Sequence, residues 1–127
     1  MNSKKKHEPR VAIIILNFNG YEDIHLLKSD NNIGFAGGNN LGLEYALKKD
    51  FDLFLLLNND TVVEKYFLNE LINCMEKDAS VGICGSKIYY YQNKSKIWSA
   101  GGGISKILKR TFQYGENKID NGHFDLK

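Results

Sequence analysis

Three polar residues end an apolar run near the middle of this chain, and they are the first candidates for chemistry. Asn58, Asn59 and Asp60 follow directly on Leu55-Leu56-Leu57. Carboxylate and amide oxygens are the ligands that Mg²⁺ and Mn²⁺ prefer. Asp60 is the single acid of the three and is therefore the predicted metal ligand. The alternative is that the segment is a turn that caps the following helix.

A second candidate segment, residues 32–42, combines glycines with asparagines in the order NIGFAGGNNLG. Glycines permit close approach of the backbone to a ligand, and free N–H groups at the start of a helix attract phosphate oxygens. The segment matches neither the dinucleotide fingerprint nor the P-loop. Without further context, a glycine-rich turn explains it equally well. Asn17 and Asn19, which follow the first apolar run, are a third group.

Strands and helices must position these residues, and the sequence predicts them from apolar runs and from apolar residues at helical spacing. Residues 11–16 are a continuous apolar run, and 52–57 have the same character after Asp52; such runs are typical of strands buried on both faces of a parallel sheet. Between them, the spacing of Leu43, Ala46 and Leu47 predicts a helix over 39–49. Because ligands bind beyond the carboxyl ends of strands in open α/β sheets, the asparagines after both runs stand where a site is expected.

The second half of the chain is predicted less sharply. A second helix is indicated by a stripe of Phe67, Leu68, Leu71, Ile72 and Met75, and Thr61 and Glu64 have the spacing of a capping box. A third strand is expected over 81–91 and a short one from residue 97 into a loop that ends at 103. The predicted fold class is α/β with a mostly parallel sheet.

Composition excludes several classes of protein. The 127 residues suffice for one domain, and 43% hydrophobic and 25% charged residues are typical of a soluble globular protein. The net charge of +2 is small, so no nucleic-acid partner is expected. No segment can span a bilayer, and the expected location is cytoplasmic. Cys74 and Cys84 are interpreted as small core residues of a reducing compartment.

The chain is expected to divide into a basic flexible tail over 1–10, one domain over 11–114 and an irregular C-terminal tail over 115–127. The basic residues of the first tail are interpreted as a solvated terminus, the alternative being contact with anionic lipid head groups at the inner face of a membrane.

Residues 24–28 also read as a strand, and this creates a geometric conflict. Seven residues, 17–23, separate them from the first strand. A parallel crossover needs about a dozen residues or more, usually including a helix. Either 24–28 is not a parallel strand, or a strand-plus-helix unit of roughly thirty residues is absent after Asp23.

Three segments together resemble family 2 glycosyltransferases, especially rhamnosyltransferase-like members with the GT-A fold. They are VAIIILNFNG at 11–20, NIGFAGGNNLG at 32–42 and LLLNNDT at 55–61; a weaker fourth is KIYYY at 87–91 with IWSAGG at 97–102. The resemblance implies an incomplete Rossmann-like GT-A domain that binds a nucleotide-diphosphate sugar through Mg²⁺ or Mn²⁺. In the full family the sugar passes, with inversion, to an acceptor hydroxyl on a glycan or a lipid-linked acceptor.

The resemblance also implies roles for individual residues. Asp60 would hold the metal, with Asn58 at the position of the first acid of the Asp-X-Asp motif. Asn32, Gly38 and Asn40 would contact the donor. Asn17 and Asn19 would contact its nucleobase or ribose, the alternative being that they cap the end of the strand.

Two departures from the family limit what this chain is expected to do. The Asp-Asn-X-Ser-X-Asp type motif of the family's second strand is absent, and so is the segment that carries its general base. No catalytic residue is therefore assigned, and the chain is interpreted as internally deleted and C-terminally truncated. The alternatives are a non-catalytic nucleotide-binding module, a self-associating homo-oligomer, or a remnant without function.

Overall fold

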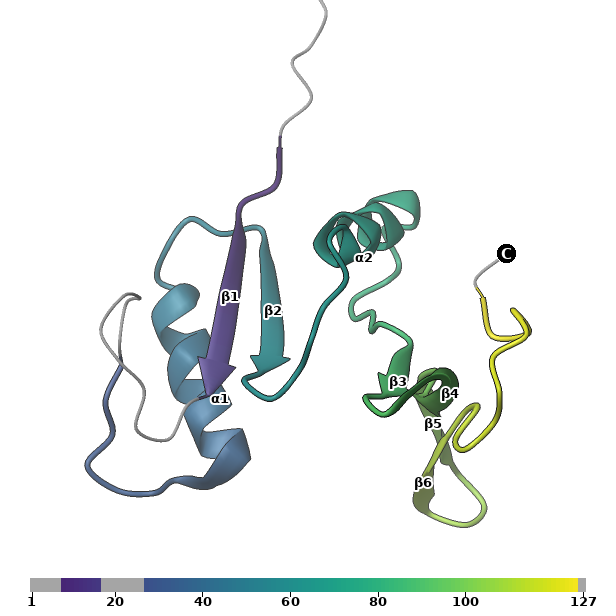
Figure 1. Ribbon diagram of the computed structural model, residues 1–127. Helices are drawn as coiled ribbons and strands as arrows, with labels where there is room; N and C mark the ends of the chain where they lie inside the picture. Colours follow the sequence, from purple (N-terminus) through teal and green to yellow (C-terminus); the bar gives the residue numbers. More distant parts are fainter. Residues whose placement is uncertain (1–7, 17–26, 126–127) are drawn as a thin grey trace, which may run out of the picture. The chain divides into compact units, whose positions relative to one another are not determined.

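The computed structural model describes residues 8–16 and 27–125 (Figure 1). The chain forms two compact units, Met1–Val62 and Val63–Lys127. The boundary falls inside the stretch 11–114 that the sequence suggests as one domain. Asn17, Asn19 and most of the expected strand at 24–28 lie outside the described residues, and residues 27 and 28 are not in a strand. Within the described part of the chain, no helix combines the length and apolar character needed to cross a membrane.

The first unit is a strand–helix–strand crossover. Strand β1 (Val11–Leu16) and strand β2 (Leu53–Asn58) pair in parallel, and helix α1 (Gly34–Ala46) connects them in sequence. The register runs from Val11 opposite Leu53 to Leu16 opposite Asn58. The two expected strands and the parallel arrangement are thus confirmed, and with them the α/β fold class. The strand beside β1 is β2, which has a helical connection long enough for a parallel pair.

Two glycines allow α1 to pack closely on β1. A Cβ atom on Gly42 would lie 2.6 Å from Cγ2 of Ile14, and one on Gly38 would lie 2.7 Å from Cδ2 of Leu16. Because Gly38 meets the last residue of β1 and Gly42 meets an earlier one, α1 runs antiparallel to the strand. The N-terminal half of α1 therefore lies at the carboxyl end of β1.

A glycine-rich turn over most of residues 32–42 is wrong, because α1 begins at Gly34 and ends at Ala46. The low helix propensity of glycine argues against a helix there. Contacts of Gly38 and Gly42 with β1 override that preference, since any larger side chain would push the helix away from the strand. The predicted helix at 39–49 was thus correct in kind and misplaced at both ends.

The second unit contains helix α2 (Phe67–Lys77) and two antiparallel strand pairs. Strand β3 (Ile88–Tyr90) pairs with β4 (Asn93–Ser99), and β5 (Gly102–Ser105) pairs with β6 (Arg110–Gln113). The apolar stripe from Phe67 to Met75 predicted α2 correctly. The capping box expected at Thr61 and Glu64 is wrong, because the helix starts beyond Glu64 and has no side-chain cap. The strand expected at 81–91 is reduced to β3.

Residues 115–125 pack against β4. Ile97, which is fully buried, donates its backbone N–H to the carbonyl of Lys118 at 2.8 Å and accepts one from Asn117 at 2.9 Å. Lys96 forms an isolated antiparallel bridge with Ile119. The segment is irregular in secondary structure, yet its backbone hydrogen bonds connect it to the core of this unit.

Cys74 and Cys84 are less buried than the core cysteines that the sequence predicts. Both are half-buried free thiols. Burial, followed by the neighbouring Cys74, raises the pKa of the Cys84 thiol. Cys84 therefore has reduced nucleophilic reactivity at neutral pH.

Candidate functional site

The carboxyl ends of β1 and β2 meet at one edge of the first unit. Leu16 and Asn58, the last residues of the two strands, are register partners. The strand arrows in Figure 1 point in the same direction. The N-terminal half of α1 reaches this edge, because Gly38 lies against Leu16. The structure thus brings the first candidate segment, 58–60, and the second, 32–42, to the same edge.

A hydrogen bond fixes the turn that carries the predicted metal ligand. The hydroxyl of Thr61 donates to the backbone carbonyl of Asn58 at 2.7 Å. This bond closes the turn around Asp60 immediately after β2 ends. Asn58 and Asp60 are both exposed, so their side chains are accessible to a ligand.

Asn32 contacts the first residue of α1 from the segment before the helix. Its side-chain oxygen accepts the backbone N–H of Gly34 at 2.9 Å. Gly34 has a φ of +72°, a conformation that glycine adopts without strain. The amide oxygen has a second lone pair, so Asn32 could contact a ligand through that oxygen or through its amide nitrogen.

The predicted binding residues inside α1 differ in accessibility. Gly38 is half-buried against Leu16, which gives it a packing role. Asn40 is exposed on the helix. Its neighbour Asn39 is buried, and its amide nitrogen donates to the carbonyl of Phe35 at 3.0 Å. Asn39 therefore stabilises the helix, a role that its place in an Asn-Asn pair did not reveal.

Asp60 is the only acidic residue in the turn that follows β2. Among residues 8–16 and 27–125, no three His, Cys, Asp or Glu side chains form a group that could hold a metal ion. A hard cation accepts amide and carbonyl oxygens as well as carboxylates, and Mg²⁺ commonly binds through one or two carboxylates plus the phosphates of its substrate. The donor set of this turn, Asp60 with Asn58, fits the protein side of such a site.

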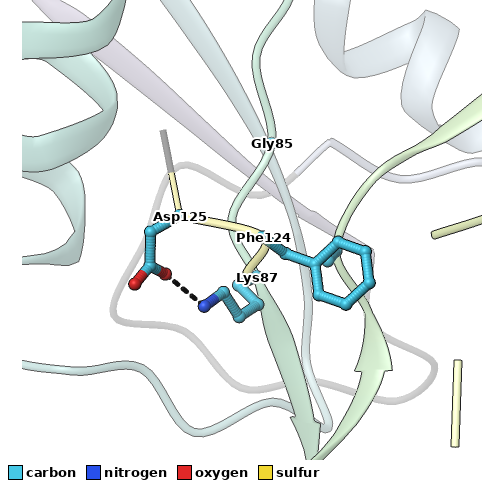
Figure 2. Close-up of a pocket in the computed structure, with 5 residues that line it drawn as sticks. Gly85, Lys87, Phe124 and Asp125 are labelled. Atoms are coloured by element: carbon cyan, nitrogen blue, oxygen red, sulfur yellow. Dashed lines mark hydrogen bonds and ion pairs between the residues drawn. The ribbon is translucent and has the colours of Figure 1, made fainter. Parts of the chain in front are cut away.

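The second unit holds a cluster of charges around Lys87. Its ammonium group pairs with Asp120 at 2.8 Å and also with Asp125, and the hydroxyl of Tyr89 donates to Asp120 at 2.5 Å. Figure 2 shows Lys87 directed at Asp125 beside the ring of Phe124. A pocket of about 280 Å³ adjoins the cluster. It is lined by Gly85, Lys87, Ala100, Phe124 and Asp125.

Hydrogen bonds among these side chains shift the pKa values of Asp120 and Lys87. The Lys87 ammonium, then the Tyr89 hydroxyl and the Gly122 N–H, lower the pKa of Asp120 to about 2. Hydrogen bonds to Asp120 and Asp125 raise the pKa of Lys87 above its usual range. The groups are therefore held as a charged network at neutral pH. Asp120 and Asp125 lie in the stretch 115–127 that was expected to be an irregular tail, and no local sequence pattern links them to Lys87.

Comparison with known protein families covers nearly all of the chain. The profile of the family described as Glycosyl transferase family 2 matches residues 8–125. Over 52 residues the chain is 38% identical to the low-salt glycan biosynthesis hexosyltransferase Agl10 of Haloferax volcanii. That match covers 40% of this chain and 17% of the relative. No solved structure matches the chain significantly.

Proposed function

This chain belongs to glycosyl transferase family 2, and we propose that its first unit binds the diphosphate of a nucleotide-sugar donor at the carboxyl edge of β1 and β2. The α/β arrangement with a parallel strand pair is compatible with part of a Rossmann-like GT-A domain. The observation that carries the proposal is the position of Asp60. Its exposed carboxylate follows β2 at the edge that the N-terminal half of α1 also reaches.

A divalent cation is part of this proposal. Asp60 would hold Mg²⁺ or Mn²⁺, and Asn58 would assist through its amide oxygen. Such a cation offsets the negative charge of a nucleoside diphosphate leaving group. The Thr61–Asn58 hydrogen bond keeps the turn closed, so that the Asp60 carboxylate is presented beyond the strand end.

Glycosyl transfer is the activity that family membership favours for the protein. We propose transfer of a sugar from the nucleotide donor to an acceptor hydroxyl, with inversion at the anomeric carbon. Donor binding is the step assigned to the described residues. The hexosyltransferase relative supports a sugar substrate, and the acceptor class stays a proposal drawn from the family.

Isothermal titration calorimetry tests donor binding directly. UDP-sugars and dTDP-sugars are titrated into the chain with Mn²⁺ and with chelator. We expect binding that depends on the metal and that Asp60→Asn abolishes. Glu44→Gln, which removes an exposed carboxylate from α1 of the same unit, is the matched control and should bind normally. Binding that is equal with and without Mn²⁺, or equal in Asp60→Asn, would contradict the proposed role of Asp60.

A second candidate function is self-association through the first unit. Among the described residues, β1 and β2 form a two-stranded sheet, and Ile13 and Ile15 are 48% and 42% exposed. Unpaired strand edges next to exposed apolar side chains favour pairing with another copy. Light scattering over a range of protein concentrations distinguishes the two candidates, since a monomer at every concentration would exclude assembly.

A further inference from the structure

The turn of the β5–β6 hairpin exposes large apolar side chains that its fold does not use. We define the hairpin tip as residues 104–110, which comprise the connecting turn, the last two residues of β5 and the first residue of β6 (Figure 1). Ile104, Ile107 and Leu108 are 75%, 92% and 60% exposed. The turn itself is closed by polar groups, because the N–H of Leu108 donates to the hydroxyl of Ser105 at 3.1 Å. The aliphatic side chains therefore contribute little to the hairpin.

Cations flank these aliphatic side chains. Lys106 precedes Ile107, and Lys109 and Arg110 follow Leu108. Over residues 79–115 the sequence contains six Lys and Arg residues and no Asp or Glu. One of the six, Lys87, is neutralised by its pairing with Asp120 and Asp125. The hairpin tip thus combines apolar bulk with positive charge that no neighbouring acid in the sequence offsets.

We propose that the hairpin tip docks on the surface of an anionic lipid bilayer. Cations next to exposed aliphatic side chains fit an interface at which negative head groups overlie hydrocarbon. The stems of Lys106, Lys109 and Arg110 can lie along apolar surface while their charged ends stay at head-group level. A nucleic acid offers the charge without an apolar phase for Ile107 and Leu108. This inference is independent of the proposed donor site, which lies in the other unit.

Vesicle sedimentation of the full chain tests the proposal. Vesicles of phosphatidylcholine mixed with phosphatidylglycerol are compared with vesicles of phosphatidylcholine alone. We expect binding to the anionic vesicles that weakens as salt is added, because exposed charges are screened. Lys106→Gln/Lys109→Gln/Arg110→Gln should weaken binding by about fivefold per cation. Ile107→Ser/Leu108→Ser should weaken it by roughly tenfold.

Two matched controls separate the tip from general surface properties. Ile83→Ser removes an isoleucine that is 93% exposed elsewhere in the second unit and should bind like the wild type. Lys28→Gln/Lys48→Gln/Lys77→Gln lowers the net charge as much as the triple variant of the tip does, and should lose much less binding. Circular dichroism confirms that each variant has the wild-type fold.

Three outcomes would overturn the proposal. The first is that the wild type fails to bind anionic vesicles. The second is that the tip variants bind as well as their matched controls. The third is that the tip variants abolish a concentration-dependent dimer while vesicle binding is absent, which would assign the tip to a protein interface.

Discussion

Gly42 of α1 lies directly against Ile14 of β1, and the space between them is too small for a methyl group. A Cβ atom on Gly42 would be 2.6 Å from Cγ2 of Ile14. Cγ2 is a methyl group bonded directly to the β-carbon of Ile14. It therefore cannot rotate away as the end of a long side chain can. Glycine at this position therefore sets how closely the helix approaches the sheet.

Gly42→Ala is expected to destabilise the first unit. Overpacking costs about 1–3 kcal/mol, and the better helix propensity of alanine returns up to about 1 kcal/mol. The net loss in the free energy of unfolding should be about 1–2 kcal/mol. Urea denaturation followed by circular dichroism measures it.

Gly38→Ala provides the comparison within the same helix. Its added Cβ would meet Cδ2 of Leu16 at 2.7 Å, and that atom belongs to a longer side chain that can rotate. The loss should be smaller than for Gly42→Ala. Equal losses would show that the stiffness of Ile14 is not the cause. Glu44→Ala, at an exposed position of α1, should leave stability nearly unchanged.

Thr61→Val is expected to loosen the turn that carries Asp60. It removes the hydroxyl that donates to the Asn58 carbonyl while preserving the shape of the side chain. The hydrogen bond is exposed, so its loss should cost about 0.5–1.5 kcal/mol of stability. Metal-dependent donor binding should weaken as well, because the Asp60 carboxylate is less well positioned.

Thr61→Ser is the matched control, since it keeps the hydroxyl donor. Calorimetry should find donor binding close to wild type in Thr61→Ser and weaker in Thr61→Val. If both variants bind equally well, the Thr61–Asn58 hydrogen bond has no part in presenting Asp60.

The two strands of the first unit could be predicted because their signal is local. The apolar runs at 11–16 and 52–57 end abruptly in polar residues, and β1 and β2 follow them within one residue. In the structure Asn58 is the last residue of β2 and Asp60 lies just beyond it, close to where this boundary predicted them. In this part of the chain, composition over six residues determines both the element and the edge at which chemistry is expected.

The remaining features depend on contacts between distant parts of the sequence. Helix α1 packs through Gly38 and Gly42 against Leu16 and Ile14, a contact that the helix propensity of glycine does not reflect. Lys87 and Asp120 are 33 residues apart, and nothing near either residue indicates the partner. The β5–β6 hairpin is also absent from the sequence prediction, because its exposed faces lack the alternation of apolar and polar residues.

Asp120 gives the second unit a pH dependence with a defined sign. Its pKa falls from the ordinary 3.8 to about 2, because Lys87 and Tyr89 hydrogen-bond the charged form. A carboxyl whose pKa is lower in the folded state stabilises the fold above its unfolded pKa. That stabilisation should be present above about pH 4 and lost as the pH falls toward about 2.

Thermal melts of the wild type and Asp120→Asn across this acidic range test the prediction. The wild type should melt at the higher temperature above about pH 4, and the difference should shrink as the pH approaches about 2. Glu116→Gln, at an exposed position outside the helices of the same unit, controls for the general loss of a carboxylate and should show a much weaker trend. A difference that stays constant with pH would mean that the charge of Asp120 does not stabilise the fold.

Asn58→Asp should strengthen the proposed metal site. Asn58 is exposed, and its contribution to the turn is its backbone carbonyl, which the substitution leaves in place. A second carboxylate beside Asp60 raises the negative charge available to a hard cation, and such sites gain affinity with the number of charged ligands. We expect Mn²⁺ to bind roughly tenfold more tightly, as measured from the loss of the free-ion signal in electron paramagnetic resonance.

Asn40→Asp adds the same charge at an exposed position on α1 and should give a smaller gain. If Asn58→Asp binds Mn²⁺ no better than Asn40→Asp, residue 58 does not face the cation and Asp60 must act with other ligands.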